Sequence, residues 1–191
     1  MWLKMASRSK DPYRTEDILA SMSVLIDTRE QDTARARRRY EAFNLPHSRA
    51  VLDYGDYTYQ AQLPDGTALF NISERITPLC AVERKMSLDE LAECFTRGRK
   101  RFQAEMERCK AHGARMYLLV ENATWENLLA GKYRSKFTPQ AFAGSLTAWM
   151  VRYDLQVIFC KEDTSAHIIR EILFRDLKER AERGDFDVQE E

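Results

Sequence analysis

The fold is decided by residues 79–121, which read LCAVERKMSLDELAECFTRGRKRFQAEMERCKAHGARMYLLVE. The stretch opens with an apolar run that turns polar at its end, and it closes with residues 115–121, which are apolar nearly throughout. Short apolar runs of this kind are typical of buried strands. Between them, Ser87 and Glu90 have the spacing of a capping box, which starts a helix. We therefore predict a strand, one long helix and an interior strand, in that order.

The long helix should bury one face, because apolar side chains recur along it at helical spacing. Gly98 falls on the same stripe, where a small residue permits close packing. The stripe consists of Leu91, Phe95, Phe102, Met106 and Cys109.

Strands and helices alternate on both sides of this stretch, which predicts an α/β domain of three layers around a central mixed sheet flanked by helices. Residues 51–63 and 67–76 are expected to pair as a hairpin across the turn Pro64-Asp65-Gly66. Residues 1–22 show no clear period and are interpreted as an N-terminal arm. The domain is expected at 23–183, before an acidic tail at 184–191. Its other expected elements are strands at 23–27 and 155–160 and helices at 33–43, 122–129, 138–153 and 165–183.

The composition excludes some classes of function but does not identify one. The chain has 191 residues with 30 basic and 30 acidic side chains, which excludes a histone-like polycation and an acidic tail protein. Residues 84–115 are nevertheless basic on balance and residues 162–191 acidic, although a solvated helix face is the ordinary explanation of one basic run. There is no membrane-length apolar run and no secretory leader, and the four cysteines lack metal-ligand spacing. We expect a cytoplasmic protein that is not secreted, with reduced thiols, no membrane and no organic cofactor.

Four acids and one lysine stand at the ends of expected strands. Asp27 and Glu30 follow the first strand, Asp56 lies at a break in an extended segment, and Glu83 and Lys85 end the strand at 79–85. Residues i and i+2 of a strand project to the same side, so Glu83 and Lys85 face one way. Such carboxylates can hold Mg²⁺, and a lysine beside them can orient water or stabilise charge on a scissile phosphate. Surface ion pairs at strand ends explain the same residues, so both interpretations stay open at this point.

A longer string of motifs resembles a known family. Residues 82–89, VERKMSLD, resemble the VERK-x-x-x-D signature of the XPF/Mus family of structure-specific endonucleases. Residues 26–30, IDTRE, resemble the opening D-x-R-E strand of that family, and residues 53–57, DYGDY, its GDY element. Gly98-Arg99 with Gln103 resembles its GR-x-x-x-Q helix, and residues 118–121, LLVE, an LLIE-like strand. The five elements occur in the order of the family and span roughly residues 23–160.

This resemblance implies a restriction-endonuclease-like domain that hydrolyses phosphodiester bonds in DNA with Mg²⁺ or Mn²⁺. Asp56 and Glu83 would be the main metal ligands, Asp27 and Glu30 would complete the acidic cluster, with Asp27 as a further ligand, and Lys85 would be the catalytic lysine. Arg29 and Arg84 would contact phosphate or brace the carboxylates, and Asp89 would lie near the site or serve the first turn of its helix. Further DNA contacts are expected at Arg97, Arg99, Lys100, Arg101 and Gln103 and in the loop of Lys132, Tyr133, Arg134 and Lys136, where the tyrosine could stack on a strand.

The chain also departs from the family pattern. The tandem helix-hairpin-helix module that normally follows the nuclease domain is not recognisable, so we expect a stand-alone nuclease domain of a bacterial or phage kind. The preference for branched DNA is in doubt for that reason. A homodimer is expected, because the helices at 138–153 and 165–183 have broad apolar faces. The alternatives are a non-catalytic DNA-binding or dimerisation partner of the same fold, or a resolvase or restriction-type nuclease.

Overall fold

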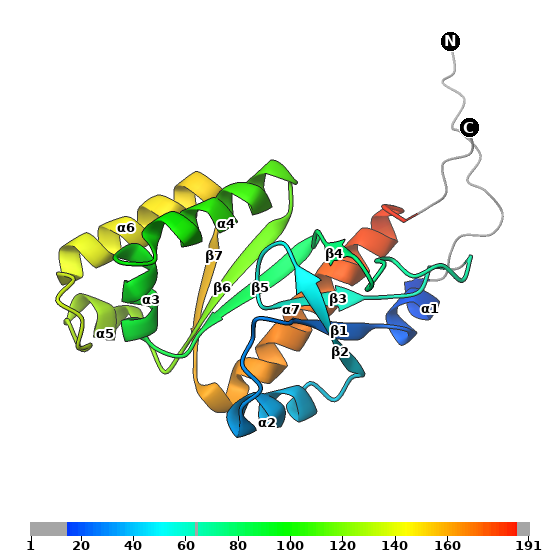
Figure 1. Cartoon of the computed structure of the whole chain (residues 1–191), viewed down its shortest axis with the longest axis horizontal. Coiled ribbons are helices and arrows are strands. Elements are labelled where there is room, and N and C mark those ends of the chain that lie inside the picture. Colours follow the sequence, from blue (N-terminus) through cyan, green and yellow to red (C-terminus); the bar gives the residue numbers. More distant parts are fainter. Residues whose placement is uncertain (1–14, 64, 187–191) are drawn as a thin grey trace, which may run out of the picture.

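The computed structural model describes residues 15–63 and 65–186, and it contains a seven-stranded mixed sheet with helices on both faces (Figure 1). The strands lie in the order β4-β2-β1-β3-β5-β6-β7. Their bounds are β1 Ser23–Asp27, β2 His47–Leu52, β3 Tyr57–Gln60, β4 Arg75–Ile76, β5 Cys80–Lys85, β6 Arg115–Glu121 and β7 Gln156–Cys160. This architecture confirms the expected three-layer α/β fold.

Strand direction determines which residues meet at one edge of the sheet. β3 pairs antiparallel with both β1 and β5, whereas the pairs β1–β2, β2–β4, β5–β6 and β6–β7 are parallel. The carboxyl ends of β1, β5 and β6 therefore lie at the same edge as the amino end of β3. Asp27, Asp56, Glu83 and Glu121 all stand at that edge.

The helices bury an apolar face against each side of the sheet. They are α1 Thr15–Ala20, α2 Ala34–Ala42, α3 Leu88–Phe95, α4 Arg99–Ala111, α5 Trp125–Leu129, α6 Pro139–Tyr153 and α7 Glu162–Arg183. One core lies under α3, α4 and α6, where Trp149 packs edge-on against Phe95 at 4.8 Å and lies 5.1 Å from Phe102 between ring centroids. The other core lies under α1, α2 and α7. None of the helices in the described ranges is both long and apolar enough to cross a membrane.

The expected long helix is two helices. Its start is as predicted, because the Ser87 hydroxyl accepts a hydrogen bond from the backbone N–H of Glu90. The helix ends at Phe95, the Thr96 hydroxyl donates to the Ala92 carbonyl, and Gly98 becomes the N-cap of α4. The apolar stripe continues across this break, since Phe95 and Phe102 both contact Trp149.

The expected hairpin is wrong beyond its turn. The backbone N–H of Leu63 donates to the Thr67 carbonyl at 2.7 Å, so the chain does reverse there, although Pro64 lies outside the described residues. The segment then leaves β3, and Arg75–Ile76 pairs parallel with β2. The reason is topological, because β1 and β5 occupy both edges of β3 and leave no edge for a hairpin partner.

The interpretation of residues 1–22 as an arm also needs correction in its described part. Thr15–Ala20 forms helix α1, which packs against α7. Ile18 and Met22 are both 2% exposed, and their i, i+4 spacing was the available signal. The helix expected at 165–183 starts earlier, at Glu162, and ends at Gly184 in the left-handed conformation.

Candidate active site

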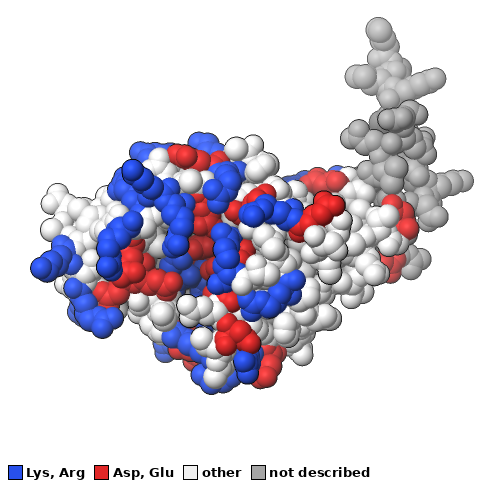
Figure 2. Space-filling model, viewed as in Figure 1, with Lys and Arg blue, Asp and Glu red and all other residues white. Residues whose placement is uncertain are grey.

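A cleft of about 760 Å³ opens at the edge of the sheet where the strand-end acids meet. In Figure 2, acidic side chains occupy the middle of this face, with Lys and Arg on both sides of them. We call this cavity the acidic cleft. Charged residues from the end of β1, from the start of β3, from β5 and from α4 line it, including Glu30, Asp56, Glu83, Lys85 and Glu105.

Backbone geometry places Asp56 in the cleft. Gly55 precedes it at φ +75°, and a Cβ there would lie 2.7 Å from the Ala81 side chain, so only glycine fits. The Asp56 carboxylate accepts one hydrogen bond, from the backbone N–H of Arg84 at 2.8 Å. Burial and then the neighbouring charge of Glu83 raise the pKa of Asp56 well above its ordinary value. Asp56 and Glu83 thus line the cleft together, and their surroundings disfavour the charged form of Asp56.

Glu83 and Lys85 face the same side of β5, as their spacing predicts. The Lys85 ammonium contacts the Glu83 carboxylate and lies 5.6 Å from the centre of the Phe102 ring. Burial raises the pKa of Glu83, and Lys85 opposes that shift. Burial by itself lowers the pKa of Lys85, but the charges of Glu83 and Asp56 outweigh it and raise the pKa. The lysine is therefore a fixed cation at neutral pH.

Asp27 has a different environment from the other acids. It is 1% exposed, and its two oxygens accept hydrogen bonds from the Arg29 guanidinium at 2.9 and 2.8 Å. The backbone N–H groups of Arg29 and Leu52 donate to it as well. Asp27 is not among the residues that line the acidic cleft, whereas Arg29 is. Its geometry is that of a residue that positions Arg29.

A buried network of charges supports the cleft from the side of α2 and β6. Glu121 is fully buried and lies 2.7 Å from Arg35, 3.2 Å from Arg84 and 3.4 Å from Arg39. Glu30 accepts hydrogen bonds from Arg84 at 3.1 Å and Arg39 at 3.4 Å. The network fixes the Arg84 guanidinium next to the carboxylates of the cleft.

The comparison with known families identifies this arrangement. The ERCC4 domain matches residues 26–172, a range that includes all the acids described above. The chain belongs to the ERCC4 domain family. This membership confirms the resemblance to XPF-type nucleases that the motifs indicated, and no curated protein matches the chain.

Solved structures of ERCC4-type proteins confirm the fold. The chain is similar to XPF from Aeropyrum pernix, with a TM-score of 0.56 and 18% identity over 81% of this chain and 61% of that one. It is also similar to XPF from Aeropyrum pernix in complex with DNA, with a TM-score of 0.55 and 18% identity over 82% of this chain and 65% of that one. The chain thus spans less than two thirds of the length of either structure.

Helix α4 faces the acidic cleft with a different side from the side of Arg99 and Gln103 that we expected. Gln103 donates to Glu107 at 2.8 Å, and neither Gln103 nor Arg99 lines the cleft. Arg101, Glu105 and Arg108 line it instead, and Glu105 accepts a hydrogen bond from the Gly55 backbone N–H at 2.8 Å. Burial raises the pKa of Glu105, and the charge of Asp56 adds to that shift. Two other expected DNA contacts, Arg97 and Lys100, are exposed on the surface outside the cleft lining, and Arg97 pairs with Glu93.

The sequence interpretation therefore missed Glu105 and Arg108 and, on α2, Arg35 and Arg39. The available signal on α4 was the spacing of Arg101, Glu105 and Arg108 at i, i+4 and i+7, which places them on one flank of the apolar stripe.

The loop of Lys132, Arg134 and Lys136 does not line the acidic cleft, and Asp89 holds it in place. The Asp89 carboxylate accepts hydrogen bonds from the backbone N–H groups of Arg134 at 2.7 Å and Ser135 at 3.0 Å. Tyr133, which could stack on a strand according to the sequence, is half-buried and held by two contacts. Its hydroxyl donates to the Phe137 carbonyl and its ring packs edge-on against Phe142, 5.4 Å away, because the loop closes over the core.

The donor chemistry of the acidic cleft fits a hard divalent cation. Within residues 15–63 and 65–186, no group of three His, Cys, Asp or Glu side chains could hold a metal by itself. Mg²⁺ is ordinarily bound by one or two carboxylates together with waters and phosphate oxygens, however. Glu83 is buried and Asp56 is half-buried, and the charge of Glu83 disfavours the charged form of Asp56. Each of the two carboxylates has an oxygen with no hydrogen bond from the described residues.

Proposed function

We propose that the chain is a DNA endonuclease that requires Mg²⁺ or Mn²⁺ and hydrolyses phosphodiester bonds in branched or otherwise structured DNA. The observation that carries this proposal is the convergence of Asp56, Glu83 and Lys85 at the floor of a cleft rimmed by arginines. Membership of the ERCC4 domain family supports it, as does the likeness to a structure determined with DNA.

Each charged side chain of the cleft has its own role in this proposal. Asp56 and Glu83 would hold the metal ion, which when bound lowers the pKa of water and neutralises charge on the scissile phosphate. Lys85 lies against Glu83 and orients the attacking water while its charge stabilises the pentacovalent phosphate. Arg29 and Arg84 hold phosphate oxygens. Asp27 positions Arg29 in this proposal and is not itself a ligand, which replaces the role expected from the motif.

Glu30 likewise acts through another residue, because it fixes the Arg84 guanidinium. On the opposite wall, Arg101 and Arg108 add two cations that face the cleft from α4. Binding of DNA backbone depends on such contacts, and they carry no sequence information. The arrangement therefore favours recognition of DNA shape over base sequence.

The alternative is a partner protein of the same fold that binds DNA without cutting it. Each of the residues proposed for catalysis is present, which argues for an active enzyme. Flap, fork, nicked, linear and single-stranded DNA should be incubated with the protein in Mg²⁺, Mn²⁺ or EDTA. Metal-dependent cleavage of at least one substrate is expected, and binding without cleavage under all conditions would favour the partner protein.

A metal titration tests the site independently of cleavage. At a Mn²⁺ concentration of a hundred times Kd, binding stabilises the fold by roughly 2.7 kcal/mol, which raises the melting temperature by roughly 5–10 °C for a domain of this size. The double change Asp56→Asn with Glu83→Gln should abolish that shift. The matched control is Glu93→Gln, an exposed acid on α3, which should keep it. Equal melting of the wild type in EDTA and in millimolar Mn²⁺ would refute the metal site.

We also propose a homodimer, although the broad apolar faces of α6 and α7 do not supply its interface. Phe142, Leu146 and Trp149 of α6 and Ile169, Leu173 and Leu177 of α7 are buried inside the domain itself, and Ile168 and Ile172 of α7 are partly buried against the same core. The outer edge of β7 has no strand neighbour among the described residues, and Val151 on α6 is 88% exposed. An unpaired edge strand is a template for a second copy. A dimer mass is expected in light scattering at micromolar concentration, and a monomer mass would contradict it.

A further inference from the structure

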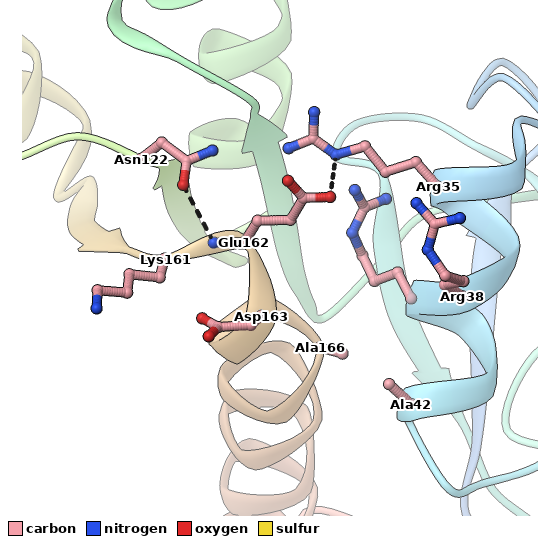
Figure 3. Close-up of a pocket in the computed structure, with 9 residues that line it drawn as sticks. Arg35, Arg38, Ala42, Asn122, Lys161, Glu162, Asp163 and Ala166 are labelled. Carbon is pink, nitrogen blue, oxygen red and sulfur yellow. Dashed lines mark hydrogen bonds and ion pairs between the residues drawn. The ribbon is translucent and has the colours of Figure 1, made fainter.

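A second pocket, of about 420 Å³, lies between α2 and the amino end of α7 (Figure 3). Its lining includes Arg35, Arg38, Arg39, Asn122 and Lys161, together with the acids Glu162 and Asp163. We call it the α2–α7 pocket. No role in the proposed function uses it, and it accounts for the basic helix α2, which the sequence shows as ARARRRYEA.

The α2–α7 pocket adjoins the acidic cleft. Arg35 and Arg39 line both cavities, so a chain of phosphates that lies in the cleft can continue past these two arginines into the pocket. Arg39 is 4% exposed at its side chain and is held by Glu30 and Glu121, so this part of the boundary is rigid.

The charges that remain available in the pocket are mostly positive. Arg35 lies 2.6 Å from Glu162, as the close-up shows, and it pairs with Glu121 as well. Arg38 and Lys161 have no acidic partner in the part of the chain that the structure describes. Asp163 is the opposing charge, and it stands in the first turn of α7.

Asn122 adds a polar group at the mouth of the pocket. It follows β6 with φ +53°, a conformation that costs energy for a residue other than glycine and that is often retained at functional sites. Its side-chain oxygen accepts from the backbone N–H of Glu162 at 3.4 Å, which leaves its amide N–H groups available to a ligand. Guanidinium, ammonium and amide donors together match the oxygens of a phosphodiester.

We propose that the α2–α7 pocket binds a backbone phosphate of the nucleic-acid strand that runs through the acidic cleft, away from the scissile bond. The inference rests on the proposed function, because the strand reaches the pocket by way of the cleft. Arg38 and Lys161 supply the charge, and Asn122 supplies the uncharged donor. Asp163 weakens the site and sets an upper limit to its affinity.

The test measures DNA binding without cleavage, by fluorescence anisotropy of a labelled flap substrate in EDTA across a series of salt concentrations. The double variant Arg38→Ala with Lys161→Ala should weaken binding roughly five- to tenfold near 0.1 M salt and reduce the steepness of the salt dependence by about 1–2. The matched control is Arg37→Ala with Arg175→Ala. It removes the same number of charges, one from α2 and one from α7, but outside both cavities, and should change affinity less than about twofold.

A third variant gives an effect of the opposite sign. Asp163→Asn removes the opposing acid and should tighten binding about two- to threefold. If the two double variants weakened binding equally, or if the first did not weaken it, the proposed phosphate site in the α2–α7 pocket would be overturned. The proposed function would still stand if the wild type cleaved DNA. A wild type that neither binds nor cuts DNA would overturn both.

Discussion

We expect the loss of Glu121 to lower the stability of the fold more than the loss of other side chains of similar size. The change Glu121→Gln tests whether the charge of the side chain is the reason. The carboxylate is fully buried at the end of β6 with Arg35, Arg84 and Arg39 around it. Glutamine has nearly the same shape, so the substitution removes the charge and leaves the volume. The three arginines then lose the one counter-charge that they share, Glu30 alone among the described acids remains beside Arg39 and Arg84, and these two are nearly inaccessible to water.

The expected magnitude follows from the burial of those partners. Arg39 and Arg84 are 4% and 12% exposed at their side chains. Removal of one member of a buried ion pair costs about 3–5 kcal/mol, because the remaining charge is left without compensation. A domain of 150–250 residues loses roughly 2–4 °C of melting temperature for each kcal/mol. We therefore expect a fall of roughly 6–20 °C.

The assay is thermal and urea denaturation followed by circular dichroism, with Glu162→Gln as the control. Glu162 also pairs with Arg35, at 2.6 Å, but its side chain is 43% exposed. Exposed pairs contribute about 0–1 kcal/mol, so the control should melt within a few degrees of the wild type. A Glu121→Gln protein within about 1 kcal/mol of the wild type would refute the view that this network holds the wall of the cleft.

Three further outcomes follow from the site. Lys85→Ala leaves the buried Glu83 without its partner and should lower the melting temperature, and it should slow DNA cleavage by at least about 10²-fold in a single-turnover assay at a temperature where the variant is folded; near-normal turnover would remove the lysine from the mechanism. The folded state raises the pKa of Asp56, so the ionised acid destabilises the fold as pH rises from the ordinary aspartate pKa of about 4 towards the raised pKa. The stability gained by Asp56→Asn in EDTA should therefore grow as pH rises above about 4, and a gain that is constant or shrinks over that range in urea titrations would contradict the shift. Asp89→Ala should free the loop at 132–136 and speed trypsin cleavage there about tenfold, whereas unchanged proteolysis would show that the core contact of Tyr133 alone holds the loop.

The sequence by itself determined much of the local structure and the orientation of two residues of the acidic cleft. Ser87 caps its helix as the capping box predicts, and Thr33 and Thr138 cap theirs in the same way, because a hydroxyl at that position satisfies a free backbone N–H whatever the tertiary fold. The spacing of Glu83 and Lys85 fixed their common orientation, because every strand alternates its side chains.

The pairing of strands was not available from the sequence. The apolar and turn pattern at 51–76 is equally compatible with a hairpin and with the observed path. The choice depends on which edges of β3 are free, and β1 and β5, far apart in the chain, occupy them both. The contacts of Asp27 depend on the tertiary structure in the same way, since Arg29 folds back onto it and the backbone of Leu52, on the neighbouring strand, completes them.

The orientation of α4 shows the limit most clearly. Residues of a helix turn by about 100° each, so both flanks of the stripe formed by Phe102, Met106 and Cys109 can be identified from the sequence. Arg99 and Gln103 lie on one flank, and Arg101 and Glu105 lie on the other. The apolar periodicity of the sequence does not show which of the two flanks faces the cleft. Only the tertiary structure decides between them, because the direction in which α4 crosses the sheet determines which flank meets the carboxyl end of β5.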